Sequence, residues 1–163
     1  KNYFPEDFDI IQFKRGKKKR EMNFEEKIAP SWALYDLSNN KIQLKDLKSK
    51  ILMIQFTGVG CGPCHHALPF LNKLVMDYKD KNFEFVSIEI WSENLEGLKN
   101  YRDQNDISYK FLNGTKKIVK DYNINSVPAF FILDQDRVIK KAIKGYRKGS
   151  TDTVITNTIN ELI

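Results

Sequence analysis

The chain has 163 residues, of which 41% are hydrophobic and 29% charged, an ordinary composition for a globular protein. This length suits one domain with a tail. The apolar runs are strand-sized and fall well short of the roughly 20 residues that a spanning helix needs, so no membrane span is predicted. Because the chain starts at Lys1 without a visible secretory signal, we expect that a preceding segment is missing.

The net charge of +6 is concentrated in one place. Six of the seven residues 14–20, KRGKKKR, are basic, and without them Lys and Arg equal the 21 Asp and Glu in number. No basic surface with interleaved aromatic residues accompanies this run, so we expect no nucleic-acid partner. A solvated tail or a contact with anionic lipid is the favoured interpretation. We assign residues 1–26 to an N-terminal extension and 27–163 to a domain.

The first half of the chain predicts a strand–helix–strand unit. Within the extension, residues 8–13 could form a strand. SWALYDL alternates as a strand does, SNNK is a turn, and IQLKDLKSK leads on to a buried strand at 51–56. A helix over 62–79 and a second buried strand over 82–91 follow. Such a unit implies a parallel strand pair with a right-handed connection.

The second half predicts two helices, a hairpin and a last helix. Ser92 would cap a helix in SENLEGLKNYRDQN, and TKKIVKDYNI suggests a shorter helix. Strands at 129–133 and 137–146 flank a turn at DQD, and a helix from about 150 to 163 ends the chain.

Cys61 and Cys64, the only cysteines, lie in GVGCGPCHHALPF and allow several interpretations. A structural disulfide closing so short a loop would contribute only about 2 kcal/mol. With His65 the motif C-x-x-C-H matches a haem attachment site. His65 and His66 could also join the cysteines around a metal, although neighbouring helical side chains project about 100° apart.

A redox function explains the spacing without any ligand. The pair lies where a buried strand ends and a helix begins, so free N–H groups and the helix dipole would favour a thiolate. Pro63 suits the first helical turn. Cys61 would then be the exposed nucleophile, and Cys64 the thiol that resolves the mixed disulfide.

SVPAFFIL downstream of the strand–CGPC–helix unit strongly resembles the thioredoxin superfamily. The stretch KIAPSWALYDLSNNKIQLKDLKSKILMIQF resembles the entry of its TlpA/ResA-like branch, and the helical region between Trp91 and Tyr122 resembles that branch's insertion. The resemblance implies an α/β thioredoxin-like fold, with a central mixed β-sheet flanked by helices. It also implies a cis bond between Val127 and Pro128.

The resemblance further implies a protein-disulfide oxidoreductase that acts on protein thiols and needs no cofactor beyond the Cys61–Cys64 disulfide. We expect a monomeric reductase that is periplasmic or otherwise exported and that could be tethered to a membrane through the missing segment. We also expect a membrane protein as its electron donor. The substrate groove would be shaped by a set of residues near the cysteines: Val127, Pro128, Gly60, Gly62 and Pro63.

Three positions depart from the family pattern. Gly60 replaces the usual Trp, Gln55 replaces a buried Asp, and Ala67 replaces a Glu. Glu89 is the nearest acidic candidate for helping to deprotonate Cys64, unless it is simply solvated.

Positive charge on either histidine after the cysteines, His65 or His66, could lower the pKa of a neighbouring thiol. Two solvated histidines on the first helical turn are the alternative. A haem- or metal-binding module and a redox-inactive interaction domain also stay open as alternatives for the whole chain.

Overall fold

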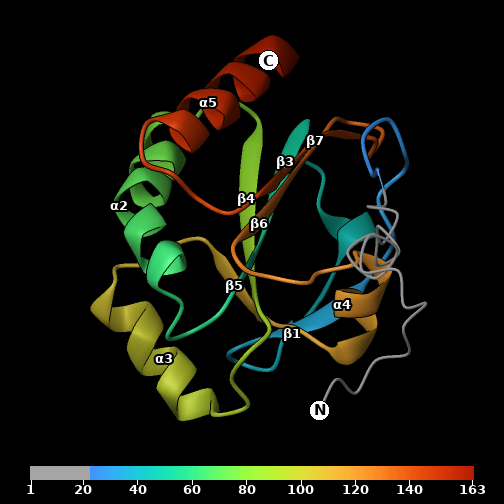
Figure 1. Cartoon of the computed structure of the whole chain (residues 1–163). Helices are drawn as coiled ribbons and strands as arrows, with labels where there is room; N and C mark the ends of the chain where they lie inside the picture. Colours follow the sequence, from blue (N-terminus) through green and yellow to red (C-terminus); the bar gives the residue numbers. More distant parts are fainter. Residues whose placement is uncertain (1–22) are drawn as a thin grey trace, which may run out of the picture.

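The computed structural model describes residues 23–163. The basic run at 14–20 and the predicted strand at 8–13 lie outside the described residues. Within that range, strands and helices alternate along most of the chain (Figure 1). No helix there is long and apolar enough to cross a membrane.

One mixed sheet forms the centre of the fold and contains the predicted parallel pair. Its strand order is β2-β1-β5-β4-β3-β6-β7. The β3–β4 and β4–β5 pairs are parallel, and the other pairs are antiparallel. The strands are β1 (Ala33–Asp36), β2 (Lys41–Gln43), β3 (Ile51–Thr57), β4 (Phe83–Glu89), β5 (Lys110–Asn113), β6 (Ala129–Leu133) and β7 (Ile139–Lys144).

Helices cover both faces of this sheet. Figure 1 shows α2, α3 and α5 on one face and α4 on the other. A short 3-10 helix, η1 (Leu44–Asp46), follows β2. The α-helices are α2 (Gly62–Asp77), α3 (Leu95–Gln104), α4 (Lys116–Asp121) and α5 (Ser150–Leu162).

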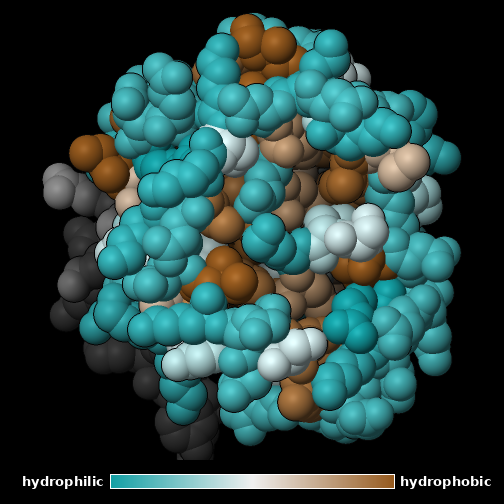
Figure 2. Space-filling view, turned by 180° about the vertical axis from the view of Figure 1, so that it is seen from behind, coloured by the Kyte–Doolittle hydropathy of each residue, from teal (hydrophilic) through white to brown (hydrophobic). Residues whose placement is uncertain are grey.

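Strand β3 is the centre of the core because all seven of its residues are buried. Leu52, Ile54 and Phe56 pack into the apolar cluster on the α4 side of the sheet. Ile51 and Met53 pack into the cluster beneath α2, α3 and α5. This burial on both faces explains the continuous apolar run in the sequence. From behind, the surface is mostly hydrophilic, with hydrophobic residues in separate areas (Figure 2).

Two local features differ from the sequence-based expectations. The region between Trp91 and Tyr122 contains strand β5 as well as helices, and β5 lies between β4 and β1 in the sheet. Helix α3 is capped by Asn94, whose side chain accepts the Gly97 N–H at 3.1 Å, and not by Ser92. The Ser92 N–H is bonded instead to the carboxylate of Glu89, which keeps Ser92 in the preceding loop.

Candidate active site

The cysteines occupy the junction between β3 and α2, as predicted. Cys61 is the N-cap of α2, and Pro63 lies in the first helical turn. The Cys61 N–H donates to the Gly58 carbonyl at 3.0 Å, which closes the loop before the helix. Gly60 adopts φ of +93°, in a region where side chains are strained. This backbone conformation gives a physical reason for glycine at a position where the family usually has Trp.

The two cysteines form a disulfide with their Cα atoms 5.3 Å apart. The Cys64 N–H donates to the Cys61 Sγ at 3.2 Å, so a helix N-terminal amide faces this sulfur. Such a group favours negative charge on the sulfur once the bond is reduced. Cys61 is 5% exposed and Cys64 1%, so Cys61 is the more accessible cysteine but is not the exposed nucleophile that we expected.

Pairing of β6 with β3 brings a distant loop to the cysteines. Ala129 lies opposite Phe56 in the register, which places Pro128 beside the end of β3. The Val127–Pro128 bond is cis, as the resemblance implied. The carbonyl oxygen of Val127 lies 3.6 Å from the Cys61 Sγ.

A groove of about 490 Å³ runs along this loop. Three of the residues predicted to shape a substrate groove, Pro63, Val127 and Pro128, line it together. Gly60 and Gly62 are not among its lining residues, and a Cβ at either glycine would meet open space. The rest of the lining was not predicted from the sequence and comes from the end of β7, the start of α5 and the loop between them: Ile143, Lys144, Gly145, Tyr146, Arg147, Ser150, Thr151 and Val154.

Gln55 forms a neutral polar pair within the sheet. It is 2% exposed, and its side-chain oxygen accepts the Ser87 hydroxyl at 2.9 Å from the neighbouring position on β4. The side chain is therefore satisfied by a hydroxyl, and this position supplies no carboxylate to the thiols.

Glu89 is buried at the end of β4 with 1% of its surface exposed, so it is not solvated. One carboxylate oxygen accepts the Val59 N–H at 2.6 Å, and the other accepts the N–H groups of Trp91 at 2.5 Å and Ser92 at 2.8 Å. Burial, and then the charge of Glu89, raise the pKa of Tyr101 on α3. The carboxylate thus joins the loop before the cysteines to the loop after β4.

His65 and His66 are both exposed on the first turn of α2. The His65 ring lies 6.5 Å from the ring of Tyr101, measured between centroids. Among residues 23–163, no group of three or more His, Cys, Asp or Glu side chains is placed to hold a metal ion. Two cysteines separated by two residues and joined by a disulfide are the arrangement that thiol–disulfide exchange uses.

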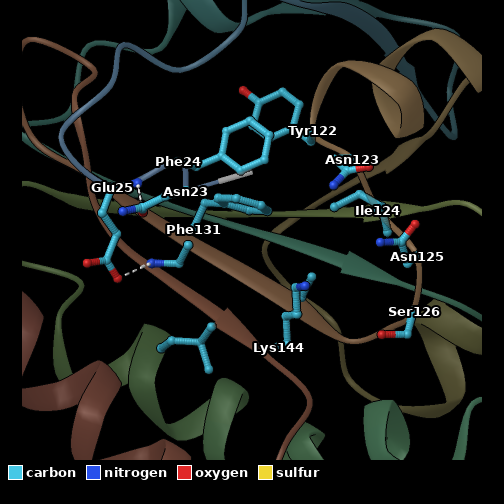
Figure 3. Close-up of a pocket in the computed structure, with 13 residues that line it drawn as sticks. Asn23, Phe24, Glu25, Tyr122, Asn123, Ile124, Asn125, Ser126, Phe131 and Lys144 are labelled. Atoms are coloured by element: carbon cyan, nitrogen blue, oxygen red, sulfur yellow. Dashed lines mark hydrogen bonds between the residues drawn. The ribbon is translucent and has the colours of Figure 1, made fainter. Parts of the chain in front are cut away.

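A second cavity, of about 330 Å³, is lined by the segment 122–126 that precedes the Val127–Pro128 bond and by residues of β6 and β7 (Figure 3). The aromatic rings of Phe24, Tyr122 and Phe131 meet there, and Ser126 lies at its edge. Pro63, Val127 and Pro128, which line the groove, are not among the residues that line this cavity, so the groove is the one that adjoins the start of α2.

Comparisons with known proteins agree with this geometry. The model of the Redoxin family matches residues 24–159. A thiol-disulfide oxidoreductase ResA of Bacillus cereus is 34% identical over 119 residues, covering 72% of this chain and 68% of that protein. The thioredoxin-like protein YneN of Bacillus subtilis (strain 168) is 32% identical over 125 residues, covering 75% and 73%.

Solved structures with low sequence identity show the same fold. A thiol:disulfide interchange protein of the thioredoxin family from Chlorobium tepidum TLS superposes with a TM-score of 0.71 at 23% identity, covering 83% of this chain and 97% of that chain. A thiol-disulfide oxidoreductase from Bacteroides fragilis NCTC 9343 superposes with a TM-score of 0.72 at 21% identity, covering 84% and 100%. The chain therefore belongs to the Redoxin family, in its TlpA/ResA-like branch with the thioredoxin-like fold, and is a thiol–disulfide oxidoreductase.

Proposed function

We propose that this enzyme reduces disulfide bonds of protein substrates in an extracytoplasmic compartment. The observation that carries the proposal is the position of Cys61 at the N-terminus of α2, where its sulfur accepts the Cys64 N–H and lies beside the Val127 carbonyl. Once reduced, this sulfur has an amide that stabilises its negative charge and a backbone acceptor next to it.

The reaction takes two exchange steps. The Cys61 thiolate attacks one sulfur of the substrate disulfide, forms a mixed disulfide, and releases the other substrate sulfur as a thiolate that takes up a proton. Cys64 then loses its proton and attacks the Cys61 sulfur, which reforms the Cys61–Cys64 bond and releases the second substrate thiol. The greater accessibility of Cys61, 5% against 1%, supports this assignment. The enzyme dithiol supplies both electrons, so no further cofactor is required.

The groove beside the cysteines would receive the substrate chain. Val127 and Pro128 form one wall, and Pro63 at the start of α2 forms another. The Val127 carbonyl is a backbone acceptor beside the reacting sulfur, where an N–H of an extended substrate segment could bind. A Cβ at Gly60 or Gly62 would meet open space, so neither residue obstructs an approaching protein partner.

The direction of exchange rests on the Gly62–Pro63 dipeptide between the cysteines, which favours the reducing direction. The Cys64 N–H that faces the Cys61 sulfur has a separate role, since it favours the thiolate, the attacking species in exchange.

The TlpA/ResA-like resemblance supports the proposed compartment and partners. A reductase outside the cytoplasm must regain electrons after each cycle, so we infer a membrane protein as the electron donor and a monomeric enzyme that meets it. His65 and His66 are exposed imidazole side chains on the first turn of α2, next to Cys64, and are the candidates for tuning the thiols.

The test is the reduction potential of the cysteine pair, measured by thiol-alkylation gel shift in graded redox buffers. We expect a value near that of thioredoxin, about −270 mV. A value near that of DsbA, about −120 mV, would reverse the proposed direction. A pair that cannot be reduced and reoxidised would instead favour a redox-inactive interaction domain.

A trapping experiment tests the roles of the two cysteines. The Cys64→Ser variant should accumulate a mixed disulfide between Cys61 and a scrambled, disulfide-bonded protein, because the resolving thiol is absent. The matched Cys61→Ser variant should trap little under the same conditions. Equal trapping by both variants would contradict the assignment of Cys61 as nucleophile.

A further inference from the structure

Trp91 is a large aromatic residue in the loop after β4, and 57% of its surface is exposed. One part of its ring covers the backbone of Gly58. A Cβ placed on Gly58 would lie 2.4 Å from the Trp91 Cδ2, 2.6 Å from Cε3 and 2.7 Å from Cγ. These separations are shorter than any real Cβ contact, so only glycine at position 58 allows the ring to lie here.

This contact places the ring next to the redox pair. The Gly58 carbonyl accepts the Cys61 N–H at 3.0 Å, so the residue beneath the ring belongs to the turn that carries the nucleophile. The carboxylate of Glu89 fixes both partners, because it accepts the N–H of Trp91 and the N–H of Val59, the neighbour of Gly58. The ring is thus held at a defined place beside the active-site loop.

Stabilisation of the fold does not explain an indole in this position. The other tryptophan, Trp32, is 8% exposed and belongs to the core cluster on the α4 side of the sheet. Trp91 leaves more than half of its surface to solvent, although a Trp side chain is among the most favourable to bury. A rigid, half-exposed aromatic ring is instead typical of residues that dominate binding to another protein.

We propose that Trp91 is a specificity-determining residue, whose exposed ring receives an apolar side chain flanking the substrate cysteine. The ring then lies on the Gly58 side of the nucleophile, while Val127 and Pro128 line the groove beside its sulfur. A disulfide with Leu or Phe next to its cysteine is preferred over one with Ser or Gly there. This inference rests on the proposed action on protein substrates.

The test compares kcat/KM for two disulfide-bonded peptides of equal length and charge, one with Leu and one with Ser beside the reacting cysteine. For Trp91→Ala we expect a loss of about tenfold on the Leu peptide, as for a typical aromatic contact residue, and less than about twofold on the Ser peptide. Hydroxyethyl disulfide, which has no flanking side chain, should be reduced at an unchanged rate. Trp91→Phe should keep most of the preference, since it keeps an aromatic face.

Tyr35, 48% exposed on β1, provides the matched control, and Tyr35→Ala should leave both peptide rates unchanged. An equal loss on the Leu and Ser peptides, with hydroxyethyl disulfide unaffected, would overturn the role of Trp91 and leave the proposed function standing. Failure of the wild-type enzyme to reduce any of the three disulfides would overturn the proposed function, and this inference with it.

Discussion

Asp36 and Glu89 are the last residues of β1 and β4, and each carboxylate accepts hydrogen bonds from backbone N–H groups of a loop. One oxygen of Asp36 accepts the N–H of Ser38 at 2.9 Å and that of Asn40 at 2.8 Å, all within the β1–β2 turn. Glu89 accepts the N–H groups of Trp91 and Ser92 in its own loop, and also that of Val59, 30 residues earlier in the chain. Asp36 is half-buried, whereas Glu89 is almost fully buried.

The difference shows how the redox loop obtains its shape. The bonds of Asp36 join residues close in sequence, so they do not depend on the register between distant strands. The bond from Val59 to Glu89 requires β3 and β4 to be paired, with Thr57 opposite Glu89. The segment before Cys61 is therefore positioned by the folded sheet, and water has little access to replace the bonds that hold it.

Among the variants considered, replacing the buried carboxylate of Glu89 should cause the largest loss of stability. In Glu89→Gln an amide NH₂ must face a backbone N–H in place of an acceptor oxygen. We expect the free energy of unfolding to fall by about 3 kcal/mol, since a buried donor loses its charged partner. Urea denaturation of the oxidised protein measures this loss. A change below about 0.5 kcal/mol would mean that the Val59 bond does not hold the loop.

Placing a methyl group against the Trp91 ring at position 58 should cause an intermediate loss of stability. Gly58→Ala places a Cβ where the Trp91 ring now lies, and we expect a loss of about 1–3 kcal/mol, as for other overpacked sites. The double variant Gly58→Ala with Trp91→Ala should recover most of it, because the ring that obstructs the methyl group is gone. Urea denaturation of the two single variants and the double variant gives the coupling. Purely additive losses would contradict the close contact.

The exposed turn should show the smallest effect, visible mainly at acid pH. Burial raises the pKa of Asp36, but hydrogen bonds from Asn40 and Ser38 outweigh burial and leave this pKa below 3.8. A lowered pKa in the folded state contributes stability above the unfolded pKa and loses it as pH falls through the folded one. Below about pH 4, wild type should therefore lose slightly more stability than Asp36→Asn.

Thermal melts of both proteins between about pH 5 and pH 2 provide the measurement. Parallel pH profiles for the two proteins would show that the turn makes no charge-dependent contribution. The contrast between the two carboxylates would be contradicted if the stability that Asp36 contributes, and that acid removes, exceeded the stability lost in Glu89→Gln at neutral pH.

Most elements were predictable because their sequences carry strong local patterns. The apolar run of β3 and the periodic apolar positions of α2 identified the two elements that carry the cysteines. Strand β5 was missed because its four residues, KFLN, alternate too briefly to signal a strand. Its place depends on hydrogen bonds from β4 on one side and β1 on the other.

The predicted site residues divide in the same way. The position of Cys61, Pro63 and Cys64 at the start of α2 was predicted because a helix start is a local property. The hydrogen bond between Glu89 and the loop before Cys61 could not be predicted, since it depends on the parallel register that puts Thr57 and Glu89 at the same sheet edge. Trp91 was missed for a related reason, because the glycine that it covers lies on another loop.

By itself, the sequence determined the thiol chemistry, the strand–helix junction that carries it, and the alternation of strands and helices, all of which arise from neighbouring residues. Only the tertiary structure decided which carboxylate holds the redox loop, which carbonyl lies beside the Cys61 sulfur, and which aromatic ring stands at the rim of the site. These contacts join residues 30 or more positions apart, such as Val59 with Glu89 and Cys61 with Val127. Pairing of β3 with β4 and with β6 brings them together. The strand–helix–strand pattern predicted that β3 and β4 are parallel, but no local pattern encodes the register that puts Thr57 opposite Glu89 or the pairing of β3 with β6.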